Sequence, residues 1–296
     1  MRVFVTGASG FIGRAVVKEL RAHGHHVIGL ARSDAAAAAI TALGAQVLFG
    51  SIEDLETLTR GAQDADGVIH LAFIHDFSKF MENGQIDKRA IEAMGEALAG
   101  ADKPFVVTSG TGLIAPGRLA TEDDVARAGE AIPRVSEPAA FAFASRGVRV
   151  SAVRLPQVHG GDGKCGFVGY LYNVAQEKAQ AAYVGDGANR WPSAHRADVA
   201  RLYRLALEKG RTGGAYHGVA DEGVSMRDIA QVLARQLNVA AVSIAPAAAG
   251  AHFGWLAMFA SLDMPASSAK TQAELGWTPA EIGLLADIGQ PGYFNS

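Results

Sequence analysis

Residues 3–13 read Val3-Phe4-Val5-Thr6-Gly7-Ala8-Ser9-Gly10-Phe11-Ile12-Gly13. The short apolar run at 3–5 predicts the first strand of a buried parallel sheet. Three glycines follow this run, and residues 14–20 then have the apolar spacing of an amphipathic helix. A strand, a glycine-rich turn and a helix in this order are typical of a dinucleotide-binding site, although a bare glycine spacing also occurs in ordinary turns.

The three glycines meet three different physical demands. One lets the chain turn sharply off the strand, one lets the backbone approach a pyrophosphate, and one lets the helix pack closely on the strand. The phosphates would lie on the exposed amides and the positive dipole end of the new helix. We call residues 7–13 the glycine-rich turn and expect it to bind the cofactor through Gly7, Ser9, Gly10, Phe11, Ile12 and Gly13.

Apolar runs of strand length recur at residues 26–30, 46–49, 66–73, 103–109 and 147–154, and helical segments lie between them. Strands that alternate with helices at these intervals predict a parallel sheet with right-handed crossover connections. We therefore expect an α/β protein of the Rossmann type, in which a doubly wound parallel sheet carries a smaller C-terminal substrate-binding portion.

Several motifs resemble those of extended and atypical short-chain dehydrogenases/reductases, the group that contains nucleotide-sugar epimerases and dehydratases. Residues 6–13 match the group's TGxxGxxG fingerprint, and residues 66–73 are close to its VIHLAA stretch. Residues 153–160 resemble LRPxxVYG with His159 in place of the tyrosine, residues 195–200 resemble HVxDVA, and residues 275–279 resemble LGWxP. These matches are spread along nearly the whole chain.

The resemblance implies two interleaved parts. Residues 1–160 would form the dinucleotide-binding domain, completed by about 194–220. Residues 161–193 and 221–296 would form the substrate-binding portion.

Composition limits the classes of function. The chain has 296 residues, of which 49% are hydrophobic and 19% charged, as in a well-packed globular enzyme. The net charge of -3 gives no electrostatic reason to expect nucleic acid or an anionic membrane as a partner. The single cysteine, Cys165, favours a reducing compartment. We expect a cytoplasmic monomer or homodimer, with no leader segment, that binds a small-molecule substrate.

The end of the second expected strand bears on the choice of cofactor. NAD-preferring folds place an acidic residue near this point to bind the ribose hydroxyls. Here the chain reads Ala31-Arg32-Ser33, so Arg32 offers a fixed cation to the 2′-phosphate of NADP, with Ser33 beside it. The alternative is a solvated surface arginine. We expect NADP to be the cofactor, with NAD also possible.

The resemblance supplies further contacts to the cofactor. Residues 50–54 resemble a GDLxD stretch in which Ser51 replaces the acid that usually faces the adenine, so the backbone around Ile52 would contact the adenine instead. The same resemblance implies that further cofactor contacts follow the fourth and fifth strands, at Leu71, Ala72, Phe73 and Thr108.

The family's catalytic pair is missing. Reduction in this group uses a tyrosine acid, a lysine four residues later, and a serine or threonine that polarises the carbonyl. The chain contains no Tyr-x-x-x-Lys. Where the pair would lie, Pro133 and Pro138 flank Ser136, which predicts that Ser136 caps a helix beginning only there.

Other side chains are candidates to replace the pair. His75 follows the fourth strand, at the sheet edge where such folds bind ligands, and an imidazole exchanges protons near neutral pH; it could also serve only the loop. Ser109 and Thr111 leave the fifth strand and would bind a substrate oxygen or merely cap a turn. Arg134 is the cation nearest the missing lysine and would hold a ribose or a substrate anion.

Two further groups of residues bear on metal and substrate binding. His159, His195 and His217 lack the spacing of metal ligands, so no metal is expected. Aromatic residues are candidates for the substrate pocket, although core packing is the commoner use of such residues. These aromatic residues are Tyr170, Tyr172, Trp191, Phe253 and Trp255.

The sequence thus predicts an NAD(P)-dependent oxidoreductase of the atypical short-chain type that acts on a small organic carbonyl or alcohol. The alternative is a non-catalytic NAD(P)-binding protein, a redox sensor or scaffold that kept the cofactor site and lost the chemistry.

Overall fold

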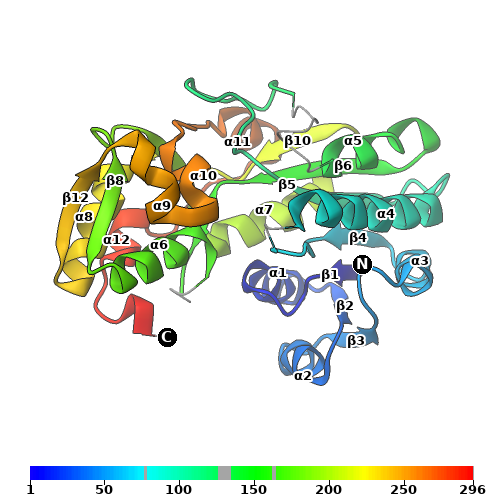
Figure 1. The fold of residues 1–296 in the computed structure, drawn as a ribbon. Coiled ribbons are helices and arrows are strands. Elements are labelled where there is room, and N and C mark those ends of the chain that lie inside the picture. Colours follow the sequence, from blue (N-terminus) through cyan, green and yellow to red (C-terminus); the bar gives the residue numbers. More distant parts are fainter. Residues whose placement is uncertain (77–78, 126–134, 162–164, 296) are drawn as a thin grey trace.

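A seven-stranded parallel sheet forms the centre of the computed structural model, which describes residues 1–76, 79–125, 135–161 and 165–295 (Figure 1). The strand order is β10-β6-β5-β4-β1-β2-β3. The bounds are β1 (Arg2–Thr6), β2 (His26–Ala31), β3 (Gln46–Phe49), β4 (Gly67–His70), β5 (Pro104–Gly110), β6 (Arg149–Leu155) and β10 (Gly214–His217). This sheet confirms the predicted doubly wound fold.

Both faces of the sheet are covered by helices, as the alternation of side chains along β1 requires. Val3 and Val5 point into one core, which packs against α1 (Phe11–Ala22), α2 (Asp34–Ala42) and α7 (Arg196–Lys209). Phe4, between them, points into the other core. That core packs against α3 (Leu55–Gln63), α4 (Phe80–Leu98) and α5 (Ser136–Phe141).

A smaller part is built mostly from the C-terminal half of the chain, and Figure 1 shows it beside the sheet. It has its own apolar core. Its helices are α6 (Gly166–Glu177), α8 (Met226–Leu237), α9 (Ala249–Phe253), α10 (Ala257–Ser261) and α12 (Leu284–Ile288). Its strands are β8 (Gln180–Val184) and β12 (Ala240–Ile244), while β7 (Gln157–His159), β9 (Arg190–His195) and β11 (Asp221–Ser225) form a three-stranded sheet. The residue limits proposed for the two parts stay a prediction.

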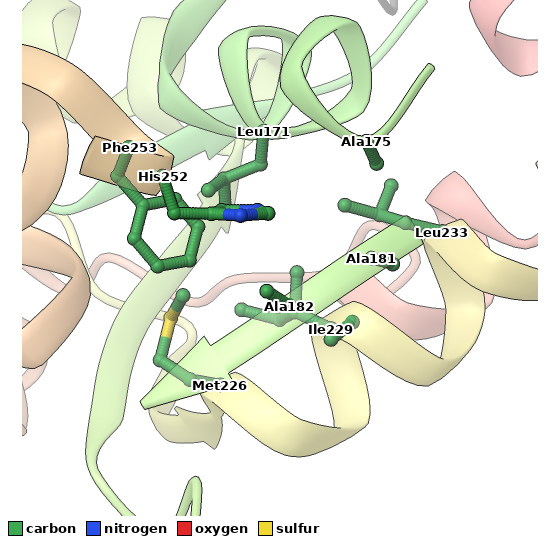
Figure 2. A pocket seen from close by; sticks show the side chains of 10 residues that line it. Leu171, Ala175, Ala181, Ala182, Met226, Ile229, Leu233, His252 and Phe253 are labelled. Atoms are coloured by element: carbon green, nitrogen blue, oxygen red, sulfur yellow. The ribbon is translucent and has the colours of Figure 1, made fainter. Parts of the chain in front are cut away.

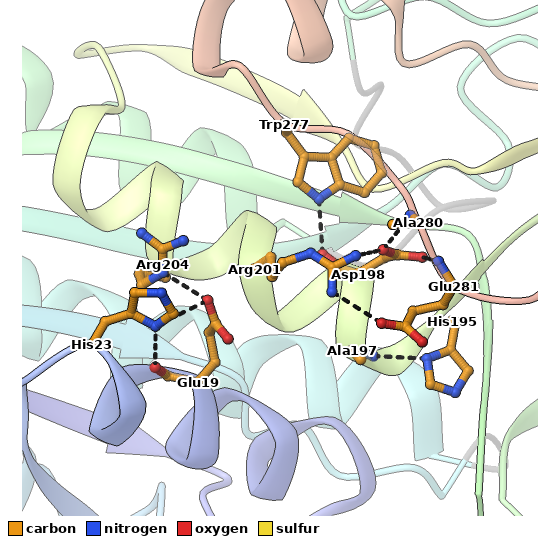
Figure 3. Close-up of polar contacts among 10 residues, drawn as sticks. All are labelled: Glu19, His23, His195, Ala197, Asp198, Arg201, Arg204, Trp277, Ala280 and Glu281. Carbon is orange, nitrogen blue, oxygen red and sulfur yellow. Dashed lines mark hydrogen bonds and ion pairs between the residues drawn. The ribbon is translucent and has the colours of Figure 1, made fainter.

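Asp198 joins two of the motifs that are far apart in the sequence (Figure 3). This carboxylate on α7 is fully buried and accepts hydrogen bonds from the amides of Ala280 (2.8 Å) and Glu281 (3.1 Å). The indole nitrogen of Trp277 donates to the carbonyl oxygen of Asp198 at 2.8 Å. The segment that resembles LGWxP is thereby fixed to the helix that follows β9.

The same view shows how α7 is tied to α1. The Arg204 guanidinium on α7 donates to Glu19 on α1 at 2.7 Å, and its bond of 2.9 Å to Glu208 lies within α7. No helix in the described parts of the chain is long and apolar enough to cross a membrane.

Helix α5 begins at Ser136, as predicted, but the proposed cap is wrong. Val135 occupies the capping position, and no side chain caps the helix. The Ser136 hydroxyl instead donates to the Asp87 carboxylate at 2.5 Å. The Ser136 hydroxyl, which the sequence predicted to cap the helix, is therefore bonded to the buried Asp87 carboxylate on α4.

Asp87 is part of a buried polar network that reaches β1. Its other oxygen lies 3.1 Å from His70 Nε2, and His70 Nδ1 lies 2.7 Å from the Thr6 hydroxyl. The Thr6 oxygen already accepts from the amides of Leu71 and Ala72, at 3.2 Å each. Its proton is therefore left for His70 Nδ1, so the imidazole carries its own proton on Nε2 and donates it to Asp87.

Replacing Asp87 by alanine tests this network. The variant leaves the Ser136 hydroxyl and His70 Nε2 as buried donors without this acceptor, which we expect to lower the free energy of unfolding by about 2–4 kcal/mol. Urea denaturation would measure the loss. Gln85→Ala, at an exposed position of the same helix, is the matched control and should change stability by about 0.5 kcal/mol or less. Equal stability of the two variants would contradict the network's importance.

Candidate functional site

A large cleft follows the carboxyl ends of the central strands. Its volume is about 1160 Å³, somewhat above the roughly 300–1,000 Å³ of common small-molecule sites. That space suits an extended cofactor together with a second molecule. All but one of the described residues expected to contact the cofactor line it. They are Gly7, Ser9, Gly10, Phe11, Ile12, Gly13, Arg32, Ile52, Leu71, Ala72, Phe73 and Thr108.

The three glycines differ in what the protein itself requires of them. Gly7 has φ +69°, and a Cβ there would lie 2.8 Å from the amide nitrogen of Ala72. A Cβ on Gly13 would lie 2.0 Å from the carbonyl oxygen of Gly7. Gly10 is exposed, and its Cβ would meet only the Gly7 carbonyl oxygen, at 3.2 Å. The packing of the protein therefore explains why positions 7 and 13 are glycine. The close approach of a ligand would explain why position 10 is glycine.

The amino end of α1 opens on this cleft. The amides of a helix's first turn have no acceptor within the helix, and Gly10 offers no side chain to cap them. Phe11, Ile12 and Gly13 belong to that turn and line the cleft. The arrangement can hold phosphate oxygens without any charged side chain.

Arg32 and Ser33 separate in the structure. Arg32 is exposed and lines the cleft just beyond β2, and no described residue forms an ion pair with it. Ser33 is not among the cleft-lining residues; it caps α2, where its hydroxyl accepts from the Ala36 amide at 3.3 Å. Of the two, only Arg32 lines the cleft.

Three of the four catalytic candidates border the same cleft. His75 is exposed, and its ring lies edge-on to Phe73 with centroids 5.6 Å apart. Ser109 and Thr111 are buried at the carboxyl end of β5. The Thr111 hydroxyl donates to the carbonyl oxygen of Leu155 at 3.3 Å. Arg134 lies outside the described residues.

The resemblance places the family's tyrosine and lysine in the segment 130–138, of which the structure describes residues 135–138. Helix α5, which begins in that segment, contributes no residue to the cleft. Glu137 instead accepts two hydrogen bonds of 2.8 Å from the Arg154 guanidinium, with both side chains buried. Since Ser136 is bonded to Asp87, the first turn of the helix serves buried polar contacts. Sequence reasoning did not identify this use of Glu137 or Arg154, because the two lie on different elements.

The Arg154 side chain also contacts the edge strand β10 of the sheet. It donates to the carbonyl oxygen of Asp124 at 2.8 Å and to His217 Nε2 at 3.2 Å. His217 Nδ1 lies 2.8 Å from the carbonyl oxygen of Ser267, to which it donates. Burial lowers the pKa of His217, which keeps the ring neutral and its Nε2 available to accept from Arg154.

The other histidines singled out by the sequence also have structural contacts. His159 Nδ1 lies 2.7 Å from the Asp287 carboxylate, and burial lowers the pKa of His159. His195 caps α7 by accepting from the Ala197 amide at 3.2 Å. Within the described residues, no group of three His, Cys, Asp or Glu side chains is arranged to hold a metal ion.

Aromatic side chains line the C-terminal side of the cleft. Of the aromatic residues expected there from the sequence, Tyr170 and Trp255 line the cleft. Trp191 and Phe253 are buried in the core, and Tyr172 stacks on the ring of Phe294. Phe167, Phe259 and Met264 also line the cleft and were missed. Phe167, Tyr170 and Asn173 recur at intervals of three on α6, and this one-face spacing was the available signal.

A second cavity lies between α6, β8 and α8 (Figure 2). Apart from the imidazole of His252, the side chains that line it are apolar, among them Leu171, Met226 and Phe253. Its volume is about 10 Å³, the room of about one water molecule. It is too small for a substrate, so the large cleft is the candidate site.

Comparison with known proteins identifies the family. The model of the NAD dependent epimerase/dehydratase family matches residues 3–128. An uncharacterized protein of Saccharomyces cerevisiae is 47% identical over 97% of this chain and 98% of its own. A second uncharacterized protein, from Schizosaccharomyces pombe, is 45% identical over 99% of this chain and 100% of its own.

A more distant relative has a named activity. The 4-hydroxy-2-methyl-3-oxo-4-farnesyl-3,4-dihydroquinoline-1-oxide ketoreductase of Stigmatella aurantiaca is 28% identical over 90% of this chain and 84% of its own. Among solved structures, the UDP-glucose 4-epimerase of Thermus thermophilus in complex with NAD superposes with a TM-score of 0.76 at 21% identity. It covers 100% of this chain and 99% of that one, and it supports the fold.

These matches agree with an NAD(P)-dependent, oxidoreductase-like role. The chain belongs to the NAD-dependent epimerase/dehydratase family.

Proposed function

We propose that this protein is an oxidoreductase that prefers NADPH and acts on a small organic carbonyl or alcohol. One observation carries the proposal: the glycine-rich turn and the side chains of His75, Ser109 and Thr111 border a single cleft. The ketoreductase among the relatives supports the same reaction class.

The cofactor would be held by the chain's own amides and one cation. The first turn of α1 binds the pyrophosphate, and the exposed face of Gly10 allows the backbone to come close. Arg32 meets the 2′-phosphate that distinguishes NADPH from NADH. The nicotinamide, when bound, supplies the hydride for the carbonyl carbon.

The chain must then supply a proton to the carbonyl oxygen. His75 is our candidate donor, because an imidazole titrates near pH 6.5 and this ring borders the cleft. Ser109 is better placed than Thr111 to donate a hydrogen bond to the substrate oxygen, since the Thr111 proton is directed at the Leu155 carbonyl. Arg134 remains our candidate for holding a ribose or a substrate anion.

The competing function is a cofactor-binding sensor or scaffold without turnover. It is favoured by α5, whose Ser136 and Glu137 are bonded to buried Asp87 and Arg154 and place no acid in the cleft. The aromatic residues that line the same cleft favour the enzyme, because a sensor of the cofactor alone needs no substrate site. We also propose a cytoplasmic monomer or homodimer, with the location argued from the single cysteine.

Gly10→Leu tests cofactor binding at a position where a Cβ would meet one other protein atom, the Gly7 carbonyl oxygen at 3.2 Å, so that only a small shift of the turn is required. The leucine side chain would stand where the pyrophosphate approaches, so calorimetry should detect no NADPH binding, while the melting temperature changes little. Gly250→Leu makes the same change at an exposed position of α9, where an added Cβ would meet no other part of the protein within 4 Å. This variant should bind NADPH normally. Unchanged affinity in Gly10→Leu would rule out this binding mode.

Arg32→Ala tests the cofactor preference. Loss of a charge-assisted contact of roughly 1.5–3 kcal/mol should weaken NADPH binding about ten- to a hundredfold and leave NADH nearly untouched. Arg235→Ala, at an exposed position of α8, controls for the loss of one positive charge. If both cofactors lose affinity equally, Arg32 does not read the phosphate.

His75→Asn tests the proton donor. We expect turnover to fall by about a hundredfold or more with cofactor affinity intact. The wild-type rate of reduction should decrease across roughly pH 6–8 as the imidazole loses its proton, provided that proton transfer limits the rate.

Tyr170→Phe is the matched variant, since it removes the only cleft hydroxyl of a described tyrosine while keeping its ring. It should retain turnover. Normal turnover in His75→Asn together with a large loss in Tyr170→Phe would transfer the donor role to the tyrosine.

A further inference from the structure

The C-terminal half of the chain gives the cleft an aromatic wall. Phe167 and Tyr170 come from α6, Trp255 from the short helix η4 (Gly254–Leu256), and Phe259 from α10. We call these four residues the aromatic wall. Three separate elements therefore converge on one side of the cleft with rings.

The rings of this wall support one another. Phe167 lies 5.4 Å from Trp255 and 5.2 Å from Phe259, and Tyr170 lies 4.9 Å from Trp255, all between ring centroids. The edge-on arrangement of Phe167 and Trp255 is one that aromatic pairs prefer. The Tyr170 hydroxyl donates to the carbonyl oxygen of Phe253 at 3.2 Å. Trp255 is nevertheless 40% exposed, so the wall offers apolar surface that the protein does not cover.

Charge is distributed unevenly around the cleft. The described charged side chains that line it are Arg32, Glu53 and Asp76, all of which follow N-terminal strands. From residue 111 onward, the described lining contains no Lys, Arg, Asp or Glu. Its polar side chains there include Gln157 and Asn173, which can orient a ligand but cannot neutralise one.

This distribution disfavours a dianionic substrate on the aromatic side. A nucleoside diphosphate placed there would bury its phosphates without a cationic side chain from the described lining, which is costly. Among the described residues of this side, the amino end of α6 at Cys165 and Gly166 is the place that would attract an anion. Because this helix end would attract a diphosphate, a nucleotide sugar is the appropriate comparison ligand.

We propose that the substrate is an uncharged carbonyl compound with an aromatic or similarly bulky apolar group, and that this group lies against the aromatic wall. The inference rests on the proposed oxidoreductase function and names its substrate class. With an uncharged substrate, the ribose is the remaining candidate partner of Arg134. In the reaction, the carbonyl carbon gains hydride from the reduced nicotinamide and the oxygen gains a proton, so the carbonyl becomes an alcohol and NADPH becomes NADP⁺.

Binding can be measured without turnover. Protein saturated with NADP⁺ cannot reduce a ketone, so calorimetric titration with 4-phenyl-2-butanone reports affinity alone. 2-Butanone, which has the same reacting group without the ring, and UDP-glucose, which carries a diphosphate, are the comparison ligands. The same titrations on cofactor-free protein keep the measurement informative if NADP⁺ does not bind.

The phenyl ketone should bind about tenfold or more tightly than 2-butanone, because the ring removes apolar surface from water. Trp255→Ala should weaken phenyl-ketone binding about five- to twentyfold, and Trp255→Phe should restore most of it. Met258→Ala removes an exposed apolar side chain of α10 that does not line the cleft, and should have no effect. As a control, the Trp255 variants should bind NADP⁺ with the same affinity as the wild-type protein.

Two results would overturn the substrate class: phenyl ketone binding no tighter than 2-butanone, or UDP-glucose binding more tightly than the phenyl ketone. Turnover with NADPH separates this inference from the proposed function. Equal kcat/KM for both ketones would refute the aromatic preference and leave the oxidoreductase intact. Tight, Trp255-dependent binding of the phenyl ketone without any turnover would support the ligand class and contradict the oxidoreductase.

Discussion

The close approach of three backbone segments determines the rest of this structure. The glycine-rich turn doubles back so tightly that a Cβ at Gly13 would lie 2.0 Å from the Gly7 carbonyl oxygen, and one at Gly7 would lie 2.8 Å from the Ala72 amide. The Thr6 hydroxyl holds that approach by accepting from the amides of Leu71 and Ala72. The ends of β1 and β4 are thus fixed together, and the cleft opens directly above them.

The same hydroxyl links the glycine-rich turn, which lines the cleft, to helix α5. Thr6, His70, Asp87 and Ser136 form one buried series of hydrogen bonds, and Glu137 of the same helix pairs with Arg154. Helix α5 is therefore anchored by two sets of buried polar contacts, and their residues on α4, α5 and β6 are not among those that line the cleft. Ser136 and Glu137 thus serve buried contacts of the fold, and neither lines the cleft. For this reason our proposed function places the proton donor on the loop after β4.

The sequence was most informative where a local pattern has one physical meaning. The strand, glycine turn and helix at 3–20 predicted the fold and the cleft-lining turn, because only a few geometries accommodate those glycines. It failed where the partner is distant: Ser136 looked like a cap because Asp87, 49 residues away, is invisible in the local pattern. Among the aromatic candidates, the sequence did not separate the exposed Trp255 from the buried Trp191, since burial depends on the packing of α6 and α10.

A structure of the protein with bound NADP⁺ tests the central claim most directly, because it locates the reacting carbon of the nicotinamide. We predict the pyrophosphate on the first-turn amides of α1, and the nicotinamide C4 facing open space between His75 and the aromatic wall. A nicotinamide C4 packed against protein, with no room for a second molecule, would contradict the account and identify a binding protein without turnover.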